Sequence, residues 1–185
     1  MGSPKALMEW HGTTLLAHTA ALVRTCIDGP MVIMRAPGQH VPLSDGVAEV
    51  IDDAVTGDGP LSALATALTA VESRAELAVV CPVDMPYLSS AFFAGLLAAL
   101  TESHDLAIAV TDGRRHPLPA IVRTSLATRT RQLVATGHRA LLDLAAAGAV
   151  AALDGEALRR ADPTSVCLRN LNSLDDYNAA RADVR

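Results

Sequence analysis

The sequence is poor in aromatic residues, lysine and cysteine. Half of the 185 residues are hydrophobic but only 3% are aromatic. Alanine, leucine and valine are therefore expected to form the core. Acidic residues outnumber basic ones by 20 to 15, and no basic stripe with interleaved aromatic residues occurs. This balance argues against nucleic acid or an anionic membrane as the main partner. The three cysteines lie far apart without the spacing of metal ligands, which is typical of thiols in a reducing compartment.

Long apolar runs are also lacking. No run approaches the roughly 20 residues of a membrane-spanning helix, and the first residues lack the pattern of a signal peptide, which favours a cytoplasmic protein. No internal repeat or linker-like tract divides the chain. A length of 185 residues suits one well-buried domain, so we expect residues 1–185 to form a single domain.

Helical and strand patterns alternate along the chain. Helices are expected at residues 13–25, 61–71, 90–101, 125–135, 138–147 and from 175 onward, and strands at 30–34, 47–51, 77–84, 106–110 and 166–168, with 118–122 returning antiparallel. The alternation predicts a Rossmann-like three-layer α/β/α fold whose sheet is mostly parallel with one antiparallel strand. Such folds usually begin with a strand and a phosphate-binding turn, so the first strand is expected to be missing here.

The most informative segment reads LAVVCPVDMPYL, residues 77–88. Its valine-rich run is typical of a buried parallel strand, and Pro86 cannot continue a ladder, so Asp84 is expected at the carboxyl end of that strand. Open α/β sheets bind ligands at this end, and a lone carboxylate there indicates a ligand of Mg²⁺ or another bound group. The alternative is a cap on the following helix, for which Ser89 and Ser90 are better candidates.

Lys5 is the one lysine among the 15 basic residues. A compact ammonium suits a phosphate group, whereas arginine favours flat bidentate pairing. A solvated surface lysine remains the alternative interpretation.

Five short motifs follow one another along the chain. They are MGSPKAL at 1–7, GPL at 59–61, DMP at 84–86, HPL at 116–118 and NLNS at 170–173. Together they resemble the molybdenum cofactor guanylyltransferases (MobA-like proteins) of the nucleotidyltransferase family. That family's first motif reads L-A-G-G-x-S-x-R-M-G-x-D/P-K, and this sequence holds its tail. The resemblance implies Mg²⁺-dependent transfer of GMP from GTP to molybdopterin with release of pyrophosphate, and transient contact with molybdoenzymes or their chaperones.

The resemblance also implies roles for the matching residues. Lys5 and Asp84 are expected to be catalytic, with Lys5 on the nucleotide phosphates and Asp84 on Mg²⁺. The other expected contacts are Asp53, Gly59 and Pro60 on the nucleotide, with Asp52 as the alternative to Asp53, and Arg139, Asn170 and Asn172 on the pterin side. A turn that caps the last helix is the alternative reading of the two asparagines. For His116, in the HPL motif, a structural hydrogen bond is favoured over catalysis.

Two departures from the family pattern leave alternatives open. The Gly-rich loop is absent, either because the protein starts before Met1 or because GTP binding is weakened. A lost first strand would also expose a sheet edge, which favours poor solubility or dimerisation. Pro4 precedes Lys5 where guanylyltransferases more often have Asp, and proline is common in cytidylyltransferases that act on the same pterin with CTP. A non-catalytic pterin- or partner-binding protein is the further alternative, while a sugar-1-phosphate nucleotidyltransferase is disfavoured by the short chain.

Overall fold

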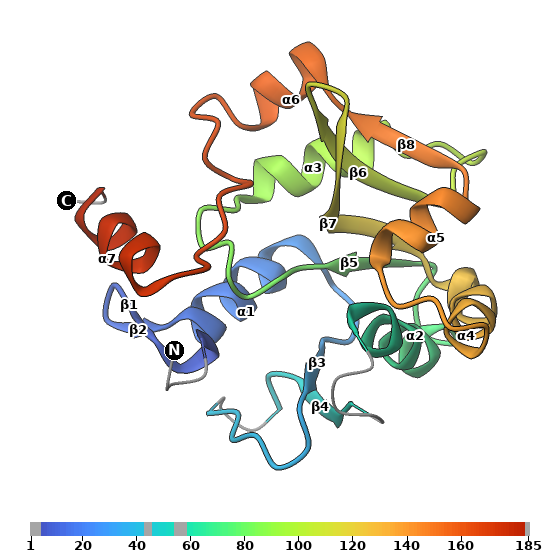
Figure 1. The fold of residues 1–185 in the computed structure, drawn as a ribbon, viewed down its shortest axis with the longest axis horizontal. Helices are drawn as coiled ribbons and strands as arrows, with labels where there is room; N and C mark the ends of the chain where they lie inside the picture. The colour runs from blue at the N-terminus through green and yellow to red at the C-terminus, as the bar shows by residue number, and fades with distance from the viewer. Residues whose placement is uncertain (1–4, 43–45, 54–58, 184–185) are drawn as a thin grey trace.

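The computed structural model describes residues 5–42, 46–53 and 59–183 of the chain (Figure 1). Its α-helices are α1 (Leu15–Cys26), α2 (Pro60–Val71), α3 (Ser90–Ala99), α4 (Ala127–Ala135), α5 (Leu141–Ala147), α6 (Gly155–Ala161) and α7 (Leu174–Asp183), with 3-10 turns η1 (Lys5–Leu7) and η2 (Thr124–Leu126). Its strands are β1 (Glu9–Trp10), β2 (Thr13–Thr14), β3 (Val32–Arg35), β4 (Glu49–Asp52), β5 (Leu77–Val80), β6 (Leu106–Thr111), β7 (Arg114–Arg123) and β8 (Val150–Leu153).

A four-stranded sheet has the order β5-β7-β6-β8. β7 runs antiparallel to both β5 and β6, whereas β8 runs parallel to β6. The one antiparallel strand is therefore confirmed. It is longer than predicted because residues 114–116 also pair with β6, and a bulge between Ile108 and Ala109 on the partner strand accommodates residues 117–119.

Helices cover both faces of this sheet. Leu106 and Ile108 of β6 pack in one cluster with residues of α2, α4 and α5. Ala107 and Ala109, which point to the opposite face, pack in a second cluster with residues of α3 and α6. This alternation is what a strand between two helical layers requires, and it confirms the three-layer α/β/α fold.

The strands β3 and β4 form a separate parallel pair. No ladder joins β3 to β5 within the described residues, and a cavity of about 970 Å³ lies between them. Figure 1 shows this pair set apart from the four-stranded sheet, with α1 nearby.

The prediction of a strand at residues 166–168 is wrong. The segment forms a turn because the buried carboxylate of Asp162 accepts hydrogen bonds from the backbone N–H groups of Val166 (3.2 Å) and Cys167 (2.9 Å). The last strand is instead β8, and α6 follows it; neither element was predicted. Both elements are too short to show a clear strand or helix periodicity.

Two predicted boundaries also shift. β5 ends at Val80, because Pro82 lacks an N–H group for the ladder, so Asp84 lies in the turn that follows the strand. The helix expected from His138 begins at Leu141, and residues 137–140 form the connection before it.

Within the described residues, no helix combines the length and the apolar character needed to cross a membrane.

Candidate active site

Lys5 and Asp84 form an ion pair although 79 positions separate them in the sequence. The Lys5 Nζ lies 3.2 Å from Asp84 Oδ2 and 3.3 Å from the side-chain oxygen of Asn172. About a third of the Lys5 side chain and a quarter of the Asp84 side chain remain exposed. Three residues that the sequence analysis singled out, one from each end of the chain and one beyond β5, therefore meet at one point that solvent can reach.

The C-terminal segment is held against Asp84 through the backbone. The Leu171 N–H donates to the Asp84 carbonyl oxygen at 2.8 Å. The next residues are fixed by a reciprocal cap on α7, in which Asp176 accepts from the N–H groups of Asn172 and Ser173 while its own N–H donates to Ser173 Oγ. The hydrogen bonds with Ser173 hold the pKa of Asp176 below its usual value. Ser173 and Asp176 thus form the cap, which leaves the Asn172 side chain to reach Lys5.

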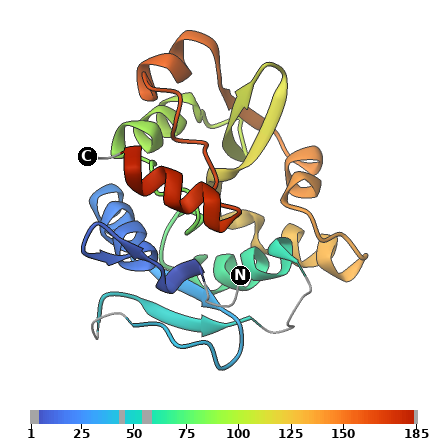
Figure 2. The same ribbon diagram turned by 60° about the vertical axis from the view of Figure 1, so that its left-hand side comes forward.

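An aromatic cluster anchors the N-terminal segment that carries Lys5. The buried Trp10 ring meets the Tyr87 ring edge-on at 5.7 Å, and Tyr177 of α7 lies beside it. The Tyr177 hydroxyl donates to the Glu9 carbonyl oxygen, and Glu9 also pairs with Arg181 at 2.5 Å. Figure 2 shows α7 lying alongside the N-terminal hairpin. Packing of distant segments, and not local sequence, positions Lys5.

The loop that carries Asp84 has its own supports. His18 of α1 lies with Nε2 2.9 Å from the Pro86 carbonyl oxygen. Ser89 caps α3 by accepting a hydrogen bond from the Phe92 N–H at 3.2 Å. The prediction that Ser89 rather than Asp84 caps this helix is confirmed.

Gly59, Pro60 and Arg139 form a second group at the start of α2. The Leu61 N–H donates to the Arg139 carbonyl oxygen at 3.2 Å, and Gly59 adopts a φ of +87° with this oxygen 2.9 Å from the place of a Cβ. Any side chain at Gly59 would meet that oxygen and strain the backbone. The Arg139 guanidinium donates to the carbonyl oxygens of Val134 and His138.

Asp53 follows β4, and its N–H donates to the Arg35 carbonyl oxygen at 2.7 Å. Its Oδ1 is buried and has no hydrogen-bond partner among the described residues. Asp52 is instead half-exposed and pairs with Arg35 at 2.6 Å. Asp52 is thus paired with Arg35 through Oδ1, whereas Asp53 has a buried oxygen without a partner, which favours Asp53 as the aspartate that contacts a ligand.

Asn170 is exposed and lies in the loop that Asp162 stabilises, and neither Asn170 nor Asn172 lies in a strand. The sequence analysis missed Asp162, which is 5% exposed and shapes the approach to Leu171. It also missed Asp176, although the S-x-x-D pattern from Ser173 signals a helix cap.

His116 makes the structural hydrogen bond that the sequence analysis favoured, with Nε2 2.6 Å from Thr111 Oγ1 across the β6–β7 hairpin. Partial burial, with Arg114 nearby, lowers the pKa of this imidazole below 6.5. A neutral ring can accept the hydrogen bond of the threonine hydroxyl.

The sequence model of one family, described as the MobA-like NTP transferase domain, matches residues 1–153. The chain belongs to this family. It is 36% identical over 183 residues to a protein of Mycolicibacterium paratuberculosis named as a probable molybdenum cofactor guanylyltransferase, covering 97% of this chain and 87% of that protein. MobA-like chains are nucleotidyltransferases, so the ion pair lies in an enzyme of this class.

Solved structures share the fold of this MobA-like chain. Molybdopterin-guanine dinucleotide biosynthesis protein A of Archaeoglobus fulgidus matches with a TM-score of 0.76 at 21% identity, over 98% of this chain and 91% of that one. The 2-C-methyl-D-erythritol 4-phosphate cytidylyltransferase of Thermus thermophilus matches with a TM-score of 0.73 at 23% identity, over 97% of this chain and 93% of that one. A Mycobacterium tuberculosis protein solved in complex with manganese matches with a TM-score of 0.68 at 18% identity, over 98% of this chain and 92% of that one.

The described residues contain no cluster of three side chains that could enclose a metal ion. Mg²⁺ does not require three protein ligands, because one or two carboxylates, together with phosphate oxygens of the substrate and water, complete its coordination shell. Asp84 supplies a hard oxygen donor that is partly exposed, and Lys5 contacts Oδ2 of its two oxygens. The arrangement in this MobA-like chain therefore fits a metal ion that arrives with a nucleotide.

Proposed function

We propose that the protein transfers GMP from GTP to molybdopterin, with Mg²⁺ as cofactor and pyrophosphate as the second product. The observation that carries this proposal is the contact of Lys5 with both Asp84 and Asn172. The similarity to a probable molybdenum cofactor guanylyltransferase over nearly the whole chain supports this choice of substrates. Transient contact with molybdoenzymes or their chaperones would then deliver the product.

The chemistry suits these residue types. Transfer at the α-phosphate needs positioning and charge neutralisation more than covalent catalysis. Lys5 would contact the phosphates and offset charge on the departing pyrophosphate, and Asp84 would hold Mg²⁺, which supplies further positive charge at the same oxygens. The attacking phosphate of the pterin is already an anion, so no strong general base is required.

The remaining residues have proposed roles in binding the two substrates. Asp53, through its buried unpartnered oxygen, would contact the nucleoside, and Gly59 and Pro60, at the start of α2, would also contact the nucleotide. Arg139, Asn170 and Asn172 would face the pterin. Arg139 lies against Gly59 through its backbone, so the proposed nucleotide and pterin contacts adjoin each other there.

A CTP-dependent transfer to the same pterin is the second candidate. Pro4 before Lys5 favours it, and one of the structures that share the fold is a cytidylyltransferase. A purely pterin-binding role is disfavoured, because a binding module has no need of the Lys5–Asp84 pair beside an exposed site.

A calorimetric titration of the 185-residue chain with GTP and then CTP, each with Mg²⁺, tests the proposal. Heat with GTP that is lost in Asp84→Asn and kept in Asp112→Asn is the expected result. Asp112 is a matched control because it lies exposed at the β6–β7 turn, with a positive φ that asparagine tolerates. Binding of CTP alone would transfer the assignment to the cytidylyl reaction, and a folded chain that binds neither nucleotide would contradict the proposal.

A further inference from the structure

One apolar cluster joins the three chain segments that carry the candidate site, and it is separate from the two clusters that cover the four-stranded sheet. Two residues of the turn that carries Asp84, Val83 and Tyr87, pack against it. Its buried members come from the N-terminal hairpin, from α1 and from the C-terminal segment, and they are Trp10, Leu15, Leu171, Tyr177 and Ala180. The segments that meet at the site therefore pack on a small core of their own.

The Tyr87 side chain contacts segments from both ends of the chain. Its ring meets the Trp10 ring edge-on, with the centroids 5.7 Å apart and the planes at 86°. The Arg169 guanidinium carbon lies 5.8 Å from the centroid of the Tyr87 ring, within the range of about 6 Å at which an aromatic ring attracts a cation. The hydroxyl donates to the Ala180 carbonyl oxygen of α7 at 3.1 Å. Tyr87 thus joins the N-terminal hairpin, the segment before α7 and α7 itself to the turn after β5.

Each residue of the site lies close in sequence to one of these contacts. Lys5 lies five residues before Trp10. On the C-terminal side, Asn172 lies three residues after Arg169. Asp84 lies in the same turn as the tyrosine itself, three residues before it. Loss of the tyrosine ring would therefore loosen Lys5 and Asn172 relative to Asp84 without removing any atom of the site.

We propose that Tyr87 is a positioning residue for the proposed nucleotidyl transfer, and that its ring keeps Lys5 and Asn172 within reach of Asp84. Its effect on the rate rests on the proposed function, whereas its effect on the Lys5–Asp84 contact does not. Charged groups stabilise a transition state only where they are held in place, and a displacement of about 1 Å can cost roughly a hundredfold in rate. Lysine needs such support because its charge sits at the end of a flexible four-carbon stem.

The ring and the hydroxyl of Tyr87 have different expected effects. The ring makes the contacts with the N-terminal hairpin and with the segment before α7, whereas the hydroxyl donates to α7. A second tyrosine, Tyr177, also ties α7 to the N-terminal hairpin through its hydroxyl. Tyr87→Phe should therefore keep Lys5 beside Asp84, and Tyr87→Leu, which lacks the ring, should not.

The single lysine of the chain, Lys5, gives a direct readout of its own position. Protein labelled with ¹³C at lysine shows one Cε signal by NMR, and Asp84→Asn should shift that signal because it removes the negative charge beside the ammonium. The shift that Asp84→Asn causes should be about threefold smaller in the Tyr87→Leu background than in the Tyr87→Phe background. This measurement needs no substrate, so its outcome is independent of the reaction that the protein catalyses.

Equal Asp84→Asn shifts in the two Tyr87 backgrounds would overturn the proposal. A parent signal that does not respond to Asp84→Asn would overturn it as well, because there would be no contact to position. Tyr87→Met is the second variant without the ring, for use where Tyr87→Leu does not fold, since the flexible methionine side chain fills irregular gaps. It should show the same reduced shift.

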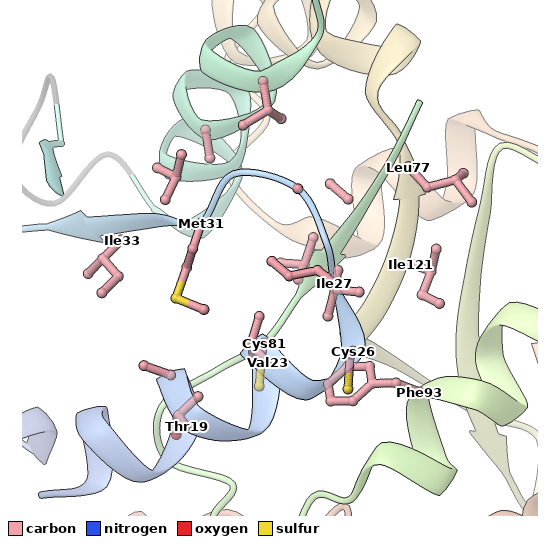
Figure 3. A pocket seen from close by; sticks show the side chains of 18 of the residues that line it. Thr19, Val23, Cys26, Ile27, Met31, Ile33, Leu77, Cys81, Phe93 and Ile121 are labelled. Carbon is pink, nitrogen blue, oxygen red and sulfur yellow. The ribbon is translucent and has the colours of Figure 1, made fainter. Parts of the chain in front are cut away.

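Kinetic constants separate positioning from a general loss of stability. Tyr87→Leu should lower kcat for GMP transfer about tenfold and change KM for GTP less, because a displaced ammonium mainly loses contacts made in the transition state. Tyr87→Phe should keep kcat close to that of the parent chain. The matched control is Phe93→Leu, since the buried Phe93 ring also meets another ring edge-on, that of Phe92 at 6.3 Å. Figure 3 shows Phe93 pointing into the cavity between β3 and β5.

Phe93→Leu should lower the thermal midpoint, as Tyr87→Leu does, and leave kcat unchanged. Equal falls of kcat in the two variants would overturn the positioning role, because a loss of packing anywhere in the core would then have the same effect. A parent chain without transfer activity would contradict the proposed function, and the Lys5 signal would then decide by itself whether Tyr87 positions Lys5.

Discussion

The Leu171 N–H donates a 2.8 Å hydrogen bond to the carbonyl oxygen of Asp84. This contact joins the C-terminal segment to the turn after β5 through backbone atoms. It places Asn172 one residue further along, where its side-chain oxygen accepts from Lys5. The candidate site therefore depends on three chain segments that pack together, and substitutions in each of them have distinct expected effects.

Replacing Lys5 by methionine keeps a long side chain and removes the charge. We expect the rate of nucleotidyl transfer to fall about a hundredfold, as is typical for the loss of one electrostatic contact to a reacting group. Lys5→Arg should restore part of the rate, because the charge returns in a flatter and bulkier form. Steady-state rates measured beside the thermal midpoints of both variants check this, and equal rates for Lys5→Met and the parent would exclude a role for the ammonium.

Asn172 and Asn170 should respond differently to truncation. Asn172→Ala removes the oxygen that accepts from Lys5, so binding of nucleotide with Mg²⁺ should weaken several-fold. Asn170 is exposed two residues away, and Asn170→Ala should leave that binding unchanged. Calorimetry on the two variants compares their affinities for the nucleotide with Mg²⁺. A larger loss of affinity in Asn170→Ala than in Asn172→Ala would contradict the prediction that Asn172 supports nucleotide binding through Lys5.

Asp162 is expected to stabilise the loop that leads to Leu171. Asp162→Ala leaves the N–H groups of Val166 and Cys167 without their acceptor in a buried place, which should lower the free energy of unfolding by about 3 kcal/mol. Burial, and then the nearby Asp162 charge, raise the pKa of the Cys167 thiol to about 11. Removal of that charge should therefore lower the thiol pKa, which a thiol-reactivity profile against pH measures. An unchanged profile and an unchanged urea midpoint would contradict this role.

Gly59→Ala tests the contact between α2 and Arg139. Both a positive φ and a 2.9 Å approach to the Arg139 carbonyl oxygen oppose a Cβ there, so the free energy of unfolding should fall by about 2–4 kcal/mol. Gly137 has a similar φ of +93° with nothing within 4 Å of the added atom, so Gly137→Ala should cost about 1 kcal/mol. Urea unfolding measures the free energy of unfolding of both variants, and the difference between their losses is the contribution of the close contact with Arg139. Equal losses would show that the Arg139 backbone shifts to accept the Cβ at no cost in stability.

His116 should contribute to the acid sensitivity of the fold. Its pKa is lowered in the folded state, so below pH 6.5 the unfolded chain binds a proton more readily at this position. The His116 contribution to the free energy of unfolding is therefore fully present above pH 6.5, is lost as the pH falls from 6.5 through the lowered pKa of the folded state, and is regained as the pH rises. NMR titration of the imidazole should give a pKa below 6.5. In His116→Asn, stability should depend less on pH between about 5 and 7, and an imidazole pKa above 6.5 would refute the argument.

Much of the fold could be predicted from local pattern. The helices over Leu15–Cys26 and Pro60–Val71 carry clear 3.6-residue periodicity, and the strand over Leu106–Thr111 is a continuous apolar run. The elements that were missed, Val150–Leu153 and Gly155–Ala161, have four and seven residues, so too few repeats of a 2- or 3.6-residue period are present to mark them. The apolar run at 166–168 misled because the segment is a turn, in which the buried Asp162 carboxylate accepts the backbone N–H groups that a strand would pair.

The candidate site divides in the same way. Asp84 could be found because a carboxylate directly after an apolar run is locally conspicuous. That Lys5 belongs to the same site came from the family resemblance, since 79 positions separate the two residues and no periodicity relates them; their ion pair itself was not predicted. His18 was missed because its role exists only through a tertiary contact, to the Pro86 carbonyl oxygen. Asp162 was missed because its local hydrogen bonds hold an irregular turn, where a strand was expected.

The central claim is that the Lys5–Asp84 site performs nucleotidyl transfer, and pyrophosphate release from GTP tests it most directly. With molybdopterin and Mg²⁺ present, the parent chain and Asp112→Asn should release pyrophosphate at similar rates, and Asp84→Asn should be about a hundredfold slower. Without molybdopterin, the release should stop in all three. An Asp84→Asn rate equal to that of the parent chain would contradict the account.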